Sequence, residues 1–136
     1  MIRLITRDEL EILDKDPVRP HINKLEVGKQ VYVLDDLSAV ICICYCTQVP
    51  TTEEELEKFR DDTGSIAVAY TVWSNKQGAG RAIVNELLEL MKAKDGINRL
   101  VTMSPLTEMA KKFHTRNGAI LLLENTDSYN FEYLLG

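Results

Sequence analysis

Two glycines and two cations stand where an apolar strand passes into a helical stretch. Lys76, Gly78, Gly80 and Arg81 all fall within the segment 72–81, and apolar residues recur at helical spacing just after it. Glycine lets a phosphate approach the backbone, and the first N–H groups of a helix have no partner inside the helix and favour an anion. The segment therefore predicts a loop that binds a pyrophosphate.

Several motifs compete for this loop. A P-loop requires Gly-Lys-Ser/Thr after a four-residue spacer, which is absent here. A Rossmann fingerprint requires a third glycine, but Ile83 stands at that position. It also requires an acidic residue at the end of the next strand to hold a ribose, and none is present there. The alternative to a phosphate site is a tight strand-to-helix turn that uses glycine only for its backbone conformation. What remains is the pattern Asn75-x-x-Gly78-x-Gly80.

A second segment, 107–119, carries Ala110, Phe113 and Gly118 at fixed offsets, with one strand between it and the glycine loop. The two segments together resemble the coenzyme A motifs of the GNAT superfamily of acyl-coenzyme A-dependent N-acyltransferases. The loop is similar to Arg/Gln-x-x-Gly-x-Gly/Ala, and the second segment to Asn-x-x-Ala-x-x-Phe/Leu-Tyr-x-x-x-Gly-Phe. The resemblance covers 65–123, about half of the chain.

This resemblance implies a fold, a co-substrate and a set of contacts. The fold would be a single N-acetyltransferase domain, 1–136, of the α/β (α+β) class, with a mixed, mostly antiparallel central sheet flanked by helices. The co-substrate would be acetyl-CoA. The residues implied to contact it are Tyr70, Thr71, Val72, Asn75, Lys76, Gln77, Gly78, Ala79, Gly80, Arg81, Thr107, Ala110, Phe113 and His114.

The chain departs from the family patterns at several positions. Asn75 stands where Arg or Gln is preferred, Thr107 replaces the asparagine, and Ala119 replaces the final aromatic residue. His114 replaces a tyrosine that in the family commonly protonates the departing thiolate. His114 is therefore one candidate catalytic residue, acting as imidazolium or by hydrogen bonding with a pKa near working pH. The alternative is that it packs against the cofactor or the helix face.

Acyl transfer to an amine also requires an oxyanion to be stabilised and an amine proton to be removed. The resemblance assigns the first task to backbone N–H groups near Tyr70 to Val72, and such a donor is worth about 3–4 kcal/mol of barrier. The strand that carries them has no carboxylate to act as a base. Deprotonation would then fall to a water relay held by Tyr70, Thr71 or Ser74, or to His21. Tyr70 is thus the other candidate catalytic residue.

The acceptor is expected to be a primary amine of an unidentified small molecule or protein, attacking directly in a ternary complex. Arg19 and His21 are the candidate substrate-binding residues, because they could read an acidic group; a solvated loop is the alternative. The resemblance implies that segments 16–23, 51–62 and 125–130 select the acceptor. Because the base is missing, a catalytically silent acetyl-CoA sensor or partner-binding subunit is the alternative function.

Local patterns place the elements that carry these residues. Thr6 and Thr52 each begin a capping box, and the helix after Thr52 is expected to be an exposed lid or flap. Ser104-Pro105 resembles a helix start, and Gly118 a helix stop. The expected strands are 1–5, 30–34, 38–47, 65–73, 97–103, 119–123 and 129–135, and the expected helices are 6–14, 52–62, 78–94 and 104–117.

Composition sets outer bounds. The chain has 136 residues, 45% of them hydrophobic and 27% charged, with a net charge of −5, as is usual for one globular domain. The acidic balance argues against nucleic-acid and anionic-membrane partners. No apolar run suggests a leader or a membrane span, so a cytoplasmic location is expected; a homodimer is left open.

Two clusters in the sequence also bear on a ligand site. The three cysteines, Cys42, Cys44 and Cys46, alternate along one strand and read as a buried face, so no metal site is expected. Basic residues, by contrast, gather near the two motifs, at Lys76, Arg81, Lys111, Lys112 and Arg116.

Overall fold

The computed structural model describes residues 1–136 and has the element order that the sequence patterns predict. Seven strands, one 3-10 helix (η1) and three α-helices follow one another along the chain. The bounds are β1 Ile2–Leu4, η1 Arg7–Lys15, β2 Lys29–Leu34, β3 Ala39–Cys46, α1 Glu53–Phe59, β4 Ile66–Ser74, α2 Ala79–Ala93, β5 Arg99–Thr102, α3 Glu108–Arg116, β6 Ile120–Glu124 and β7 Tyr129–Tyr133.

All seven strands form one mixed sheet in the order β1-β2-β3-β4-β5-β7-β6. Neighbouring strands are antiparallel except β4 and β5, which run parallel. Their pairing ends where Ala69 meets Thr102, while β4 continues to Ser74 paired only with β3. A bulge in the β3–β4 pair leaves Tyr70 without a partner at this point. The mixed α/β class is thus confirmed, and the sheet opens in its middle.

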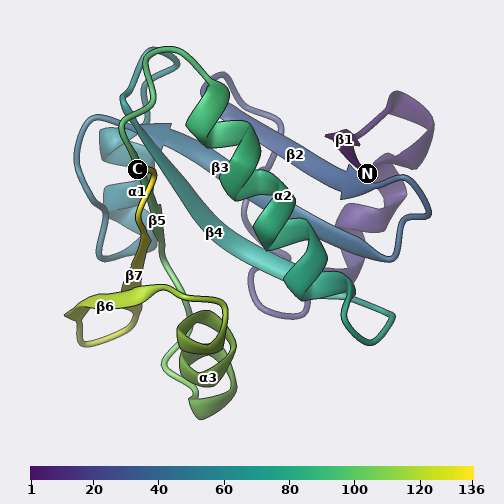
Figure 1. Ribbon diagram of the computed structural model, residues 1–136. Coiled ribbons are helices and arrows are strands. Elements are labelled where there is room, and N and C mark those ends of the chain that lie inside the picture. The colour runs from purple at the N-terminus through teal and green to yellow at the C-terminus, as the bar shows by residue number, and fades with distance from the viewer.

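Helices cover both faces of this sheet (Figure 1). Helix α2 crosses one face because its apolar stripe, including Ile83, Leu87 and Met91, is fully buried against the sheet. Helix α3 lies on the same side, beyond the opening, with Phe113 packed on the same cluster. The opposite face is covered by η1 and α1. None of the helices is long and apolar enough to cross a membrane.

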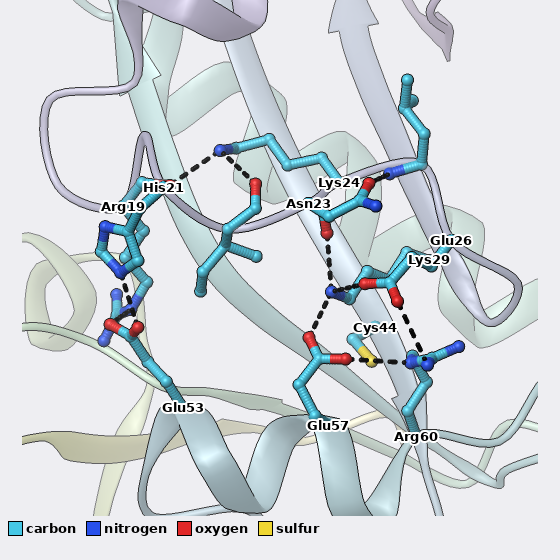
Figure 2. A network of polar contacts seen from close by, with 12 residues as sticks. Arg19, His21, Asn23, Lys24, Glu26, Lys29, Cys44, Glu53, Glu57 and Arg60 are labelled. Carbon is cyan, nitrogen blue, oxygen red and sulfur yellow. Dashed lines mark hydrogen bonds and ion pairs between the residues drawn. The ribbon is translucent and has the colours of Figure 1, made fainter.

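Helix α1 is part of this second core, and the expectation of an exposed lid is wrong. Leu56 is fully buried in the cluster that also contains Cys42, Cys44 and Cys46, all free thiols. From the adjacent position, the half-exposed Glu57 carboxylate accepts a hydrogen bond from the enclosed Lys29 ammonium (Figure 2). Leu56, the partly buried Phe59 and this ion pair thus hold a helix that is otherwise charged.

The start of α3 also differs from expectation. Ser104-Pro105 does not begin the helix: Ser104 is buried and forms a β-bridge with Tyr129, which extends the sheet by one step. The cap is Thr107 instead, whose Oγ1 accepts a hydrogen bond of 3.1 Å from the amide of Ala110. Long-range pairing therefore overrides the local Ser-Pro signal.

Candidate functional site

The loop between β4 and α2 presents free backbone N–H groups at the start of a helix. Gly78 caps α2 with a φ of +83°, a conformation that favours glycine. The first backbone bond of the helix runs from Ala82 to Gly78, so the earlier amides have no partner in the helix. The amides of the loop and first helical turn without any partner in the chain are those of Lys76, Gln77, Gly78, Gly80 and Arg81.

At Gly80, glycine is required by a close packing contact and not by the backbone angle. A Cβ built there would lie 3.3 Å from the Phe113 ring and 3.5 Å from Ser74 Oγ, whereas a Cβ on Gly78 would meet nothing within 4 Å. The absent side chain at Gly80 therefore lets the α2 N-terminus approach α3. Between them lies an outer cavity of about 640 Å³, lined by Ser74, Asn75, Lys76, Gln77, Gly78, Gly80, Arg81, Met109, Lys112, Phe113, Arg116 and Asn117.

The outer cavity is strongly cationic within an acidic protein. Lys76 and Arg81 border it from the loop, and Lys112 and Arg116, one turn apart on α3, border it from the other side; no carboxylate lines it. Lys76 has one long ion pair, 3.7 Å, to Asp36. The basic residues that gather in the second motif, Lys112 and Arg116 among them, were the sequence signal for this half of the site.

An inner cavity of about 710 Å³ fills the opening between β4 and β5 and shares Ser74, Gly80, Met109 and Phe113 with the outer one. The two are therefore continuous. Half of the inner wall is hydrophobic. It is lined by Pro17, Val18, Arg19, Ala69, Tyr70, Thr71, Val72, Trp73, Ser74, Gly80, Met103, Ser104, Pro105, Thr107, Met109, Ala110, Phe113 and His114.

His114 lies on this inner wall as a buried, neutral imidazole. Its Nδ1 is 2.7 Å from the Tyr133 hydroxyl, and its ring stacks on Phe131 with centroids 5.2 Å apart. Burial lowers the pKa of His114 to about 4. The imidazolium considered from the sequence is therefore absent at neutral pH. If the Tyr133 hydroxyl donates to Nδ1, the proton of the neutral ring sits on Nε2.

Tyr70 lines the inner cavity, but its side chain does not suit a proton relay. The residue is 1% exposed, and the hydroxyl is enclosed without a hydrogen-bond partner. Burial raises the pKa of this phenol, and Lys29 lies 5.8 Å from the ring centroid. The candidate role of the Tyr70 side chain in catalysis is therefore replaced by packing.

A buried carboxylate that the sequence analysis did not single out stands behind Thr71. Asp16 accepts hydrogen bonds from the amides of Val18 and Arg19 and, at 3.0 Å, from Thr71 Oγ1. Burial alone would raise the pKa of Asp16, but these bonds and Lys24, 3.0 Å away, lower it. Asp-Pro followed by two bonded amides is an Asx turn, the only local signal for this site.

The two candidate substrate residues have different positions. Arg19 is 5% exposed and lines the inner cavity. His21 lies on the surface with its side chain 61% exposed, and its Nε2 is 2.6 Å from the Glu53 carboxylate. His21 lines neither cavity. The structure thus does not bring it to the site, as a base or as a substrate contact.

The remaining predicted residues converge. The loop Asn75–Arg81 lines the outer cavity except for Ala79, which is buried in the core. Thr71, Val72, Thr107 and Ala110 line the inner cavity. No group of three or more His, Cys, Asp or Glu side chains is arranged to hold a metal ion.

No protein-family model and no curated protein sequence matches the chain. Solved structures do. GphF GNAT-like decarboxylase in complex with isobutyryl-CoA is 13% identical, with a TM-score of 0.78 and 100% of each chain covered. Arabidopsis thaliana NAA60 in complex with acetyl-CoA is 16% identical, with a TM-score of 0.64 and 98% of each chain covered. AtaT complexed with acetyl-methionyl-tRNAfMet is 16% identical, with a TM-score of 0.58, covering 96% of this chain and 92% of AtaT.

The chain therefore has the GNAT fold, and the resemblance drawn from the two motifs is confirmed at the level of the fold. The AtaT complex is relevant to the expectation, drawn from net charge, that nucleic acids are not partners. Because a protein of this fold is complexed with a tRNA, the exclusion of nucleic-acid partners is not supported.

Proposed function

We propose that this protein transfers an acyl group, in the first instance acetyl, from an acyl-coenzyme A to a primary amine. The observation that carries the proposal is the continuous pair of cavities. Five unpartnered amides and four cations surround the outer one, and the inner one, half of whose wall is hydrophobic, is lined by Thr71 and His114. NAA60 in complex with acetyl-CoA supports the choice of co-substrate.

The outer residues match the charge of a coenzyme A pyrophosphate. The Gly80 and Arg81 amides, with the dipole of α2, favour an anion, and Arg116 and Lys112 add charge from α3. The thioester would then lie in the opening between β4 and β5.

In the proposed reaction the amine nitrogen attacks the thioester carbon, so a C–N bond forms and the C–S bond breaks. The amine proton passes to water, and the thiolate takes up a proton. A neutral His114 can donate a hydrogen bond to the sulfur through Nε2 without changing charge. Since no carboxylate lines the inner cavity, orientation of the amine carries much of the rate.

The substitution Gly80→Glu tests the anion site. A carboxylate at this position would fill the space in front of the amides and repel a phosphate, so we expect acetyl-CoA affinity to fall by about 100-fold or more, as for a charge-assisted contact turned repulsive. Calorimetry measures the affinity, and thermal unfolding checks the fold. Asn85→Glu is the matched control, because it adds the same charge to the exposed side of the same helix.

Because Gly80→Glu also crowds Phe113, the exposed pair Lys112→Glu and Arg116→Glu provides a second test without a packing change. Undiminished acetyl-CoA affinity in both variants would remove the anion site. Turnover is measured separately as thiol release over a panel of small amines, peptides and aminoacyl-tRNA. Tight acetyl-CoA binding without thiol release from any acceptor would favour a silent sensor.

A second candidate function is decarboxylation of an acyl-coenzyme A that carries a carboxylate. The inner cavity has one guanidinium and no carboxylate, which suits an anionic acyl group better than a cationic amine, and GphF is a decarboxylase of the same fold. The C–C bond to the carboxyl group would break, CO2 would leave, and a proton from solvent would replace it on carbon. Release of CO2 from malonyl-CoA tests this reaction.

A further inference from the structure

Arg19 is the only charged side chain that lines the inner cavity. The other polar groups on that wall are hydroxyls, backbone groups, the Trp73 indole and the neutral His114. A positive charge on the wall of a cavity that no carboxylate lines repels a cationic acceptor and attracts an anionic group, and the low dielectric strengthens both effects. The charge of this one residue therefore bears on which substrates can enter.

The structure holds this arginine firmly from behind. Its Nη1 donates a hydrogen bond of 2.7 Å to the Tyr70 carbonyl at the bulge, and its Nε lies 3.3 Å from the half-exposed Glu53 carboxylate. The Asp16 carboxylate accepts a hydrogen bond from the Arg19 amide, which fixes the turn that carries the side chain. Figure 2 shows Arg19 beside Glu53 and His21, at one end of the polar contacts that also include Lys24 and Lys29.

The guanidinium still has unused capacity. Its Nε is enclosed beside the Glu53 carboxylate, whereas Nη2 takes part in none of the hydrogen bonds in the chain. Burial lowers the pKa of Arg19, against the opposing effect of Glu53 and Asp16, so its two partners do not fully offset the cost of burying its charge. A further anion beside it would complete the pairing, and the planar fork of arginine fits a carboxylate.

Thr71 provides the complementary group. Asp16 is ionised, since its pKa is lowered, and it can only accept hydrogen bonds; the Thr71 hydroxyl must therefore be the donor in their 3.0 Å bond. The lone pairs of Thr71 Oγ1 are then left for another donor. A hydroxyl fixed in this way accepts an N–H from an amine but cannot donate to it.

We infer that Arg19 binds a substrate carboxylate in the inner cavity, and that the acceptor is an amino acid-like molecule whose amine contacts Thr71. This inference rests on the proposed acyl transfer at the same site. The carboxylate has a second source, the acyl group of a carboxyacyl-coenzyme A. The recognition by Arg19 is the same in both cases, and the experiment separates them.

The test compares acids with their neutral counterparts. Thiol release from acetyl-CoA is measured with each common amino acid and with its carboxamide, for wild type, Arg19→Gln and Arg19→Lys. We expect kcat/KM to favour the acid by about 10- to 100-fold in wild type, the range of a hydrogen-bonded charge pair. We expect Arg19→Gln, which can still donate to the Tyr70 carbonyl, to lose that preference, and Arg19→Lys to keep part of it.

A purely structural role for Arg19 would lower the rates for acid and amide together and leave their ratio unchanged, so an unchanged ratio overturns the inference. Lys58→Gln is the control, because it removes one exposed positive charge from α1 without touching either cavity. We expect this variant to keep the wild-type ratio.

The second arm compares malonyl-CoA with acetyl-CoA by calorimetry in the same variants. Tighter binding of malonyl-CoA that depends on Arg19 would assign the carboxylate to the acyl group. That result would support Arg19 as the carboxylate site and overturn the amino acid-like acceptor. Efficient turnover of neutral amines with no preference for acids, together with equal binding of the two thioesters, would overturn the whole inference while leaving acyl transfer intact. Failure of acetyl-CoA to bind would instead remove the proposed function.

Discussion

His114 and Tyr70 show how burial decides what a titratable side chain can do. Both are polar residues on the wall of the inner cavity. The His114 ring has a hydroxyl partner and is kept neutral, whereas the Tyr70 hydroxyl has no partner and its pKa is raised. Residue type alone made both of them catalytic candidates. The enclosure leaves a neutral, hydrogen-bonded ring at His114 and a packed phenol at Tyr70.

The depressed pKa of His114 predicts how stability depends on pH. The unfolded chain binds a proton at this residue below about 6.5, and the folded chain only below about 4, so the free energy of unfolding falls as pH drops from about 6.5 to about 4. At about 1.4 kcal/mol per pKa unit, the full loss is about 3 kcal/mol.

Denaturant unfolding of wild type and His114→Phe over this pH range measures the effect. The difference between their pH slopes is assigned to His114, since the other titratable groups are common to both chains. Parallel pH dependences in the two proteins would show that the imidazole titrates normally in the folded state.

Site residues could be predicted from the sequence where their contacts are local, and not where their contacts are distant along the chain. Gly78, Gly80 and the cations around them could be predicted because a phosphate loop uses adjacent residues in one turn. The importance of Asp16 could not, since it depends on contact with Thr71, 55 positions away in the sequence. The sequence offered Arg19 and His21 equally as substrate-binding candidates. In the structure, the loop that carries them places Arg19 on the cavity wall and His21 on the surface.

At the scale of elements, the apolar periodicity of the sequence predicted the strands and helices that pack against the core along their whole length. Helix α2 and the strands Lys29–Leu34 and Ala39–Cys46 match the expected segments closely because their apolar patterns are continuous. The two errors, in α1 and at the start of α3, arise where a few long-range contacts decide. The Lys29–Glu57 ion pair and the bridge at Ser104 have no local signature.

Helix α1 provides the test of this interpretation. Leu56 is fully buried, so Leu56→Ala leaves a cavity in the core under β3 and is expected to lower the free energy of unfolding by about 2–5 kcal/mol. Lys58→Ala, on the exposed side of the same helix, is expected to change it by less than about 0.5 kcal/mol. A separately moving lid would instead show faster hydrogen exchange in α1 with global stability unchanged.

At the scale of the whole molecule, the fold separates charge by location. The net charge is −5, yet four cations meet at the outer cavity and one guanidinium faces the inner one. The cations come from the glycine loop, from α3 and from the segment after η1, so the sheet opening between β4 and β5 is what brings them together. An acidic protein can therefore still bind a polyanion, because local potential and not net charge governs the site.

The sheet also ends in an uncovered apolar edge. Strand β6 pairs only with β7, and it projects from the body of the molecule (Figure 1). Its residues Ile120, Leu121, Leu122 and Leu123 are 37–54% exposed. Natural proteins usually protect such an edge with charge, proline or a partner chain, and here only Glu124 at its end is charged.

We expect this edge to pair with β6 of a second copy, because antiparallel pairing about a two-fold axis is self-complementary and would cover the leucines on both chains. Sedimentation at increasing concentration measures the mass, and Leu121→Lys with Leu123→Lys is expected to keep the protein monomeric by placing like charges opposite one another. Val27→Lys, which alters an isolated residue that is 73% exposed, is the control and should leave association unchanged. A wild-type protein that stays monomeric at all concentrations would instead mean that the edge remains open.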